Sequence, residues 1–193
     1  SVITLLCLIG PFFAPNDPLA TNLAHVLLPP NEQYPLGTDQ VGRCILSRLL
    51  YGARVSIGLT LLLLTLVSVI GFVIGFIAAT RGKWVDATLM RLADMALAFP
   101  EIIFVIAVVG MLGPSVFNMI IALSLIWWTK YARLTRTLIM RYKNAPFVEA
   151  ARMGGASNWQ ILKRYIFPNI ASPLVVQYML DIGGMMLTIA SLS

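Results

Sequence analysis

The stretch VEAARMGGASNWQILKRYIFP, residues 148–168, lies between two strongly apolar segments and carries the features that decide the fold. Pro146, just before it, suits the first turn of a helix, because a proline lacks an N–H that would have no helical acceptor there. The Gly154-Gly155 pair predicts that this helix ends at about Met153. The sequence therefore predicts a short helix followed by a glycine break.

A second short helix is predicted after the glycines. Ser157 and Gln160 have the spacing of a capping box, in which each side chain bonds to the other residue's backbone N–H. Gln160, Lys163 and Arg164 share one helical face, and we expect Pro168 to end the helix. The apolar residues of the opposite face are Ile161, Leu162, Tyr165 and Ile166. Periodicity alone is equally compatible with an amphipathic loop that lies on a bilayer surface.

Composition places the chain among integral membrane proteins. Of its 193 residues, 59% are hydrophobic and 11% are charged, and the mean hydropathy is +0.85. The formal net charge of +6 is concentrated, because eight of the 14 Lys and Arg lie between Lys130 and Arg164, where Glu149 is the only acid. The positive-inside rule places this segment in the cytoplasm. No nucleic-acid-binding motif accompanies these cations, so we expect no nucleic acid as a partner.

Apolar runs predict the membrane-spanning segments. Residues 55–80 carry no charge and are long enough for a tilted span. Further spans are expected over about 93–112, 117–138 and 173–193. Gly71 and Gly75 lie four residues apart on one face of the first of these helices, where they allow close approach of a neighbouring helix.

The remaining segments connect these spans. Residues 1–13 are too short to cross a hydrocarbon layer of about 30 Å, and we interpret them as the end of a truncated first transmembrane helix. Residues 14–54 balance acids against arginines, which favours an extracytoplasmic loop. Residues 139–172 form the predicted cytoplasmic loop, and we expect one or more final spans to be missing beyond residue 193.

The pattern Glu149-Ala150-Ala151, three residues, Gly155, nine residues and then Tyr165-x-Phe167-Pro168 resembles the EAA loop of bacterial ABC importer permeases. Tyr165 and Phe167 stand where that family usually has aliphatic residues. The resemblance implies an all-α, polytopic transmembrane helical bundle of the type I ABC importer permease kind, with a cytoplasmic two-helix coupling loop. In that family the loop fits into a cleft of a separate ATPase subunit. The residues implied in ATPase coupling are Glu149, Ala150, Ala151, Gly154, Gly155, Ala156, Ser157, Asn158, Trp159, Lys163, Arg164 and Pro168.

Two further stretches resemble the peptide and nickel branch of these permeases. One runs from Leu36-Gly37-Thr38-Asp39 through Gly42-Arg43 to Arg54-Val55-Ser56, although Cys44 replaces the aspartate that usually follows the Gly-Arg pair. The other, residues 180–187, is more similar to the nickel-importing members. The resemblance therefore implies a cargo of nickel, free or chelated, or of di- or oligopeptides, and it favours nickel. Histidines found in some nickel importers are absent near residues 180–187, so no residue is assigned as a metal ligand.

The same resemblance implies a transport subunit and not an enzyme, embedded as a multi-pass protein in the bacterial cytoplasmic (inner) membrane. The implied partners are a second homologous permease, two ABC ATPase subunits, an extracytoplasmic solute-binding protein and membrane lipid. No cofactor is expected in this chain, because the stretch from Gly75 to Lys83 has the wrong glycine spacing for a phosphate loop and Trp84 replaces its Ser or Thr. ATP and Mg are expected on the partner ATPases.

Three carboxylates fall within predicted spans, and such residues should face protein or water. Asp94, Glu101 and Asp181, together with Met185, are therefore candidate residues of a translocation pathway. For Asp94 the alternative is a structural pair with Arg91, one helical turn away. The carboxylates also leave a second class of function open, an ion-coupled secondary transporter that uses them as a relay. Co-purification without an ATP-binding subunit, and uptake that survives ATP depletion, would favour that alternative.

Overall fold

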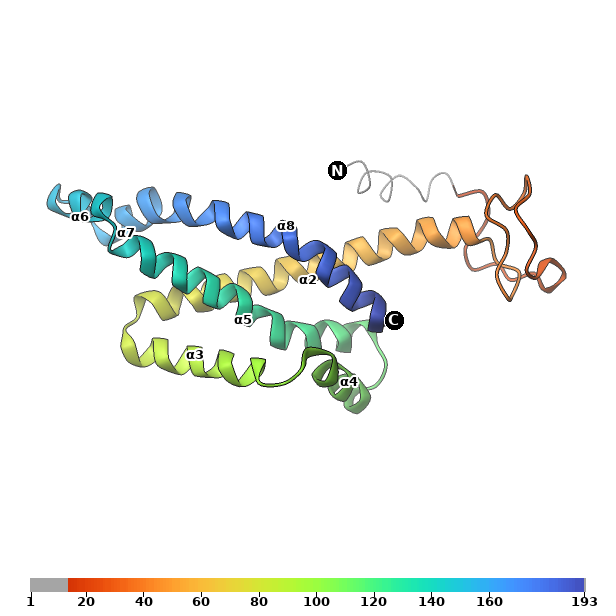
Figure 1. The fold of residues 1–193 in the computed structure, drawn as a ribbon, viewed down its shortest axis with the longest axis horizontal. Helices are drawn as coiled ribbons and strands as arrows, with labels where there is room; N and C mark the ends of the chain where they lie inside the picture. Colours follow the sequence, from red (N-terminus) through yellow and green to blue (C-terminus); the bar gives the residue numbers. More distant parts are fainter. Residues whose placement is uncertain (1–13, 193) are drawn as a thin grey trace. The chain divides into compact units, whose positions relative to one another are not determined.

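The computed structural model describes residues 14–192, which are largely α-helical (Figure 1). The elements in order are the 3-10 turn η2 (Leu23–His25), α2 (Ile45–Thr80), α3 (Lys83–Leu97), α4 (Glu101–Leu112), α5 (Val116–Lys143), α6 (Pro146–Met153), α7 (Asn158–Ile161), the π-helical turn η3 (Leu162–Ile166) and α8 (Phe167–Leu192). Within the described range, the β contacts amount to one isolated bridge between Thr38 and Cys44. The predicted all-α class is confirmed, and the expected truncated helix over residues 1–13 lies outside the described residues.

The described chain divides into two compact units. The first comprises residues 14–61 and 186–191, and it holds the long loop before α2 and the first part of that helix. The second comprises residues 62–185 with Leu192, and it holds the rest of α2, all of α3 to α7, η3 and most of α8. Residues 146–168, which include the motif-bearing stretch 148–168, lie entirely within the second unit.

Two helices are long and apolar enough to cross a membrane, namely α2 and the helical run from Asn158 to Leu192, and α3 with α4 make a third if the bent pair counts as one span. α2 begins ten residues before the predicted start at 55, and α8 begins at Phe167 instead of 173. The predicted bounds were too narrow because an uncharged run marks only the apolar part of a helix. Arginine is a good helix former, so α2 includes Arg48 and Arg54 without ending. Membrane placement of α5 stays a prediction.

The predicted span 93–112 is not one straight helix. α3 ends at Leu97, α4 begins at Glu101, and the two are bent by 84° at the break. Pro100 explains the break, because a proline disfavours helical backbone at the preceding residue, here Phe99, and cannot donate a helical hydrogen bond. α3 also begins at Lys83, ten residues before the predicted start of the span at 93.

Gly71 and Gly75 bring α2 into close contact with α5, as their spacing predicts. A Cβ at Gly71 would lie 2.5 Å from both the Trp128 carbonyl oxygen and the Tyr131 Cβ. A Cβ at Gly75 would lie 2.3 Å from the Ala132 carbonyl oxygen. Both separations are far inside ordinary van der Waals contact, so the two helix backbones can approach this closely only with glycine at these positions.

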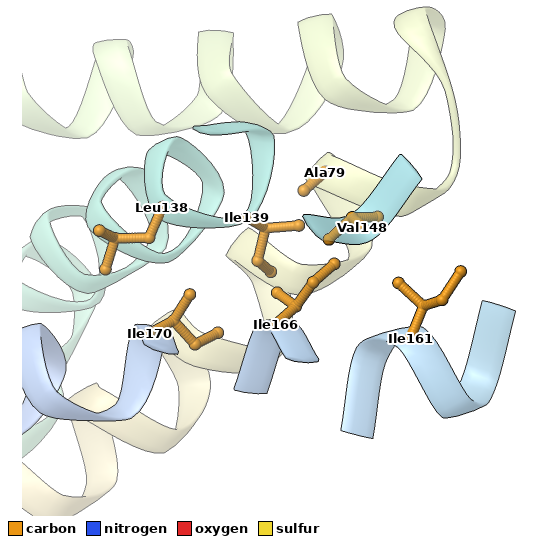
Figure 2. Packing of buried hydrophobic residues seen from close by; sticks show 7 residues of the cluster. All are labelled: Ala79, Leu138, Ile139, Val148, Ile161, Ile166 and Ile170. Carbon is orange, nitrogen blue, oxygen red and sulfur yellow. The ribbon is translucent and has the colours of Figure 1, made fainter. Parts of the chain in front are cut away.

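A cluster of buried apolar side chains joins the ends of α2 and α5 to the segment between α6 and α8 (Figure 2). Its members are Ala79, Leu138, Ile139, Val148, Ile161, Ile166 and Ile170. Leu162 and Tyr165 pack against the cluster, so the apolar stripe predicted for the second short helix is the face that is buried. Residues 146–168 are therefore anchored on two long helices and do not hang free as a surface loop.

We expect Gly75→Ala to destabilise the protein by about 1 to 3 kcal/mol, because the new Cβ meets backbone atoms of α5 that cannot move alone. Gly58→Ala is the matched control, since a Cβ at Gly58 on the same helix has nothing within 4 Å. That control should be neutral or slightly stabilising, because alanine favours helix over glycine. Melting temperatures of the purified variants in one detergent test this, and equal values for both would contradict the close packing.

Candidate functional site

α6 starts and ends where the sequence predicts. Pro146 occupies its first turn, and Val148 on its inner face is fully buried. The helix ends at Met153, where the Gly154 N–H donates to the Ala150 carbonyl. Gly155 then takes a backbone conformation with φ of +81°, which non-glycine residues rarely adopt, and this reverses the chain direction.

The predicted capping box is confirmed at the start of α7. The Ser157 N–H donates to Gln160 Oε1 at 2.8 Å, and the Gln160 N–H donates to Ser157 Oγ at 3.3 Å. The box satisfies donors that would otherwise be unpaired at the helix start. It therefore fixes the angle at which the chain leaves the glycine break.

The expectation that Pro168 ends the second helix is wrong, because α7 continues through η3 directly into α8. In η3 the Phe167 N–H donates to the Leu162 carbonyl, five residues earlier, as in a π-helix. Such a turn is wider than an α-helical turn, which relieves the clash between a proline ring and the carbonyl four residues before it. The part of the coupling-loop-like segment from Asn158 onward is thus one continuous helix with α8.

α6, the glycine break and the α7–η3 segment surround a concavity with a volume of about 1070 Å³. We call the surface that lines it the coupling surface. It is lined by Phe147, Ala150, Ala151, Gly154, Gly155, Ala156, Trp159, Gln160, Lys163, Arg164 and Tyr165. Eight of these belong to the predicted coupling set. Phe147, Gln160 and Tyr165 also line it but are absent from the predicted coupling set, although Gln160 and Tyr165 lie within the motif. The predicted residues outside this lining are Glu149, Ser157, Asn158 and Pro168.

The coupling surface combines small residues, which leave the backbone accessible, with larger exposed side chains. Trp159 is 68% exposed, and Met153 at the end of α6 is 84% exposed. Lys163 and Arg164 are also exposed, and neither has an ion-pair partner among the described residues. Exposed apolar side chains next to unpaired cations are typical of a surface that binds another protein.

The cations near the middle of α5 are all paired with carboxylates on other helices. Lys130 contacts Asp181 of α8, while Arg133 contacts Asp94 and Arg136 contacts Asp86, both on α3. Arg136 also donates from Nη2 to Asp86 Oδ2 at 2.5 Å, so that pair is bidentate. The basic segment 130–164 contains only one acid, but three of its cations are neutralised by acids that lie outside it in the sequence.

Asp181 lies among donors from two helices. Lys130 Nζ donates to its Oδ1 at 2.6 Å, the Tyr131 hydroxyl donates to its Oδ2 at 3.0 Å, and Gln177 Nε2 donates to Oδ1 at 2.9 Å. The Asp181 side chain is 7% exposed, but that of Lys130 is 48% exposed. Lys130 Nζ also lies 5.7 Å from the centre of the Trp127 ring. The carboxylate is thus fully satisfied, while the ammonium remains partly open.

The other pathway candidates differ in their surroundings. Asp94 pairs with Arg133 and not with Arg91, because Arg133 is presented by the neighbouring α5. Glu101 accepts a hydrogen bond from Trp127 Nε1 at 2.8 Å and has no ion pair among the described residues. Met185 is fully buried. Contacts do not bring the four candidates into one cluster, and within residues 14–192 no group of three or more His, Cys, Asp and Glu could hold a metal ion.

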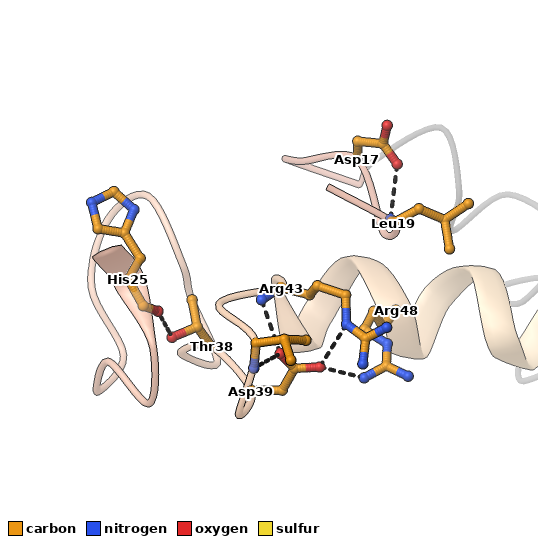
Figure 3. Close-up of polar contacts among 8 residues, drawn as sticks. Asp17, Leu19, His25, Thr38, Asp39, Arg43 and Arg48 are labelled. Carbon is orange, nitrogen blue, oxygen red and sulfur yellow. Dashed lines mark hydrogen bonds and ion pairs between the residues drawn. The ribbon is translucent and has the colours of Figure 1, made fainter. Parts of the chain in front are cut away.

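The loop before α2 is organised around Asp39 (Figure 3). Its carboxylate accepts from the backbone N–H groups of Val41 and Arg43, from Arg43 Nε at 2.9 Å and from Arg48 Nη1 at 2.5 Å. Burial acts to raise the pKa of Asp39, but the hydrogen bonds from Arg43 and Val41 and the Arg43 charge hold that pKa well below its usual range. The Asp39 and Arg43 positions of the predicted signature thus form one interaction, and Cys44 beside them is buried.

These features define an α-helical membrane protein that carries an exposed segment anchored on its long helices. Residues 71–193 match the family described as binding-protein-dependent transport system inner membrane component, and the chain belongs to that family. It is therefore a permease component of an ABC importer, a transport component and not an enzyme, which works with an ATPase and a binding protein.

Individual relatives fall in the branch that the sequence motifs indicated. The chain is 39% identical over 193 residues to the nickel transport system permease protein NikC of Escherichia coli (strain K12), covering 100% of this chain and 70% of that protein. It is 35% identical over 197 residues to the dipeptide transport system permease protein DppC of Haemophilus influenzae, covering 99% and 67%. It is 35% identical over 191 residues to the probable D,D-dipeptide transport system permease protein DdpC of Escherichia coli (strain K12), covering 99% and 64%. The predicted peptide and nickel branch is confirmed.

Asp181→Asn should lower the melting temperature far more than Asp94→Asn. The enclosed Asp181 carboxylate accepts three hydrogen bonds, whereas a pair as exposed as Asp94–Arg133 contributes about 1 kcal/mol or less. Asp94 is the matched control because its side chain is 64% exposed. The double variant Lys130→Met, Asp181→Asn should recover part of the loss, since it leaves no unpaired ammonium. Equal effects of the two single variants would contradict the burial of Asp181.

From the contacts of Asp39 we expect the order of this loop to depend on pH only under acidic conditions. A lowered pKa in the folded state means that Asp39 stabilises the loop at pH above its ordinary pKa of about 3.9, and that this contribution is lost as pH falls below it. Hydrogen-exchange protection of the Val41 and Arg43 amides, corrected for intrinsic rates, should therefore stay constant from neutral pH to about pH 5. Asp39→Asn should reduce that protection at every pH. A decline between pH 7 and pH 5 in the unmodified protein would contradict this assignment.

Proposed function

We propose that the coupling surface is the docking site of the ATPase subunit and that its movement drives import. The observation that supports this most directly is the concavity of about 1070 Å³ lined by eight of the motif residues. Family membership requires an ATPase partner, and the coupling surface is an exposed, rigidly anchored surface with unpaired cations. Glu149, Ser157, Asn158 and Pro168 belong to the same segment but lie outside the lining of the concavity. Ser157 caps α7, and Pro168 lies where η3 continues into α8.

The proposed mechanism follows from how residues 146–168 are held. Their inner face packs on the ends of α2 and α5 through the apolar cluster, and their C-terminal end is continuous with α8. A displacement of α6 and α7 by the ATPase therefore reaches α8 through a helix and not through a flexible loop. ATP binding would favour one orientation of this segment, and the membrane helices would open alternately to each side.

The proposed assembly contains this chain, a second homologous permease, two ABC ATPase subunits and an extracytoplasmic solute-binding protein in a bacterial inner membrane. ATP and Mg bind to the ATPase subunits. Residues 139–172 face the cytoplasm, residues 14–54 face the opposite side, and the spans include about 55–80, 93–112, 117–138 and 173–193. The charge distribution supports this orientation, because five unpaired cations remain between Arg141 and Arg164 after the α5 pairs are removed.

For the cargo we propose nickel, free or chelated, or di- or oligopeptides, in line with the names of the relatives. The pathway candidates remain Asp94, Glu101, Asp181 and Met185. Among the carboxylates, Glu101 is favoured as a pathway residue, because its recorded partner, Trp127, is neutral. Asp94 and Asp181 are each neutralised by a cation of α5, which favours a role in helix packing.

The same pairs disfavour a secondary transporter. A proton or ion relay needs carboxylates that exchange their partners easily, and Asp181 is held by three donors. Membership of the binding-protein-dependent family also assigns energy coupling to an ATPase. Import driven by ATP hydrolysis is therefore the function that we propose, and the coupling segment is where it can be tested.

Gly155→Val should uncouple ATP hydrolysis from uptake in the assembled importer. The reason is conformational, because Gly155 has φ of +81° while a Cβ there meets nothing within 4 Å. Gly155→Asn should retain more uptake than Gly155→Val, since asparagine tolerates this conformation and a β-branched residue does not. Uptake and ATPase rates in proteoliposomes, at matched subunit content, measure the effect.

Gly110→Ala is the matched control for this series. Gly110 lies in α4 and does not line the coupling surface, and a Cβ there has nothing within 4 Å. Its uptake per ATP should equal that of the unmodified importer. Full uptake by Gly155→Val at normal subunit content would contradict the coupling role of the glycine break.

A further inference from the structure

A second cavity, of about 330 Å³, lies where the coupling segment meets the ends of α2 and α5. Its wall is apolar and is formed by Phe76, Ile139, Ile161, Leu162 and Ile166. Three of these belong to the buried cluster, and Phe76 and Leu162 pack against it. The cavity is therefore a rigid feature of the fold. Of its lining residues, it shares only Trp159 with the coupling surface.

The rim of this cavity is polar and basic. Thr80, Lys143, Arg152 and Asn158 line it together with Trp159. Neither Lys143 nor Arg152 has an ion pair among the described residues, in contrast to the three paired cations of α5. No lining residue is acidic. Two uncompensated positive charges thus stand at the mouth of an apolar pocket.

The position of the cavity matches a membrane boundary. Thr80 is the last residue of α2, the more apolar of the two candidate spans, and Lys143 is the last residue of α5. On both helices an apolar lining residue lies about one turn before the polar one, with Phe76 before Thr80 on α2 and Ile139 before Lys143 on α5. Trp159, which is 68% exposed at the rim, has the amphipathic ring that favours the headgroup region of a bilayer.

We propose that this cavity binds a phospholipid with an anionic headgroup from the cytoplasmic leaflet. The phosphate contacts Lys143 and Arg152, and an acyl chain lies along the apolar wall. Arginine and lysine are the usual partners of phosphate groups, and basic residues beside a membrane attract anionic lipid. This inference rests on the orientation given in the proposed function, and it adds a ligand that braces the coupling segment against the ends of α2 and α5.

Native mass spectrometry of the assembled importer in detergent, titrated with phosphatidylglycerol or phosphatidylcholine, tests this site. We expect one tightly held phosphatidylglycerol for each copy of this chain and no comparable retention of phosphatidylcholine. The double variant Lys143→Gln, Arg152→Gln should weaken that retention by about tenfold or more. Thr80→Phe, which places a ring at the exposed cavity mouth without changing charge, should weaken it as well.

The matched control is Arg81→Gln, Arg141→Gln, which removes the same two charges from nearby positions that do not line the cavity. Equal lipid loss from both double variants, or from neither, would overturn the proposal. Displacement of the lipid by inorganic phosphate alone would also overturn it, because the apolar wall would then be unused. So would loss of the ATPase from the Lys143→Gln, Arg152→Gln complex with lipid retention unchanged, since the rim would then belong to the ATPase interface.

The lipid measurement needs no ATP turnover, and the Gly155 series needs no added lipid species. Absence of the lipid with uncoupling by Gly155→Val would reject the lipid site and keep the coupling role. Retained lipid with full uptake by Gly155→Val would keep the lipid site and reject the coupling role of the glycine break.

Discussion

Three cations on α5 each meet a carboxylate on another helix, and the arrangement of the second unit depends on these pairs. Lys130 joins α5 to α8, while Arg133 and Arg136 join it to α3. In a bilayer an unpaired charge at such positions would be costly, so pairing fixes which helices can be neighbours. Pairs that differ in burial also differ in strength, and of the three carboxylates that of Asp181 is the most enclosed.

The coupling segment depends on the same helix. α5 ends at Lys143, and the apolar cluster binds its last turns to α6, α7 and η3. The π-helical turn then lets the chain pass Pro168 without a break and enter α8, which returns to α5 at Asp181. α5 therefore contacts the coupling segment at one end and α8 further along. In the proposed mechanism, these contacts carry a displacement of the coupling segment to α5 and α8.

Local signals in the sequence predicted much of this segment, because caps, glycine breaks and helical periodicity depend on neighbours in the chain. Pro146, Gly155 and the Ser157–Gln160 box are all found as predicted. Contacts between distant residues could not be predicted in this way. Asp94 was assigned to Arg91 by proximity, whereas Arg133 pairs with it from another helix. Lys130, Tyr131 and Trp127 were missed for the same reason, although the i, i+4 spacing of Gln177 and Asp181 was visible.

Pairing also changes how the basic loop is understood. Counted along the sequence, its eight cations form one positive segment, but three of them neutralise acids of α3 and α8. The remaining five divide by location: Lys163 and Arg164 line the coupling surface, Lys143 and Arg152 line the smaller cavity, and Arg141 lies over the Tyr142 ring. A protein partner and an anionic lipid would each meet two of these charges. The proposed docking role and the proposed lipid contact thus use different cations, which allows each to be altered separately.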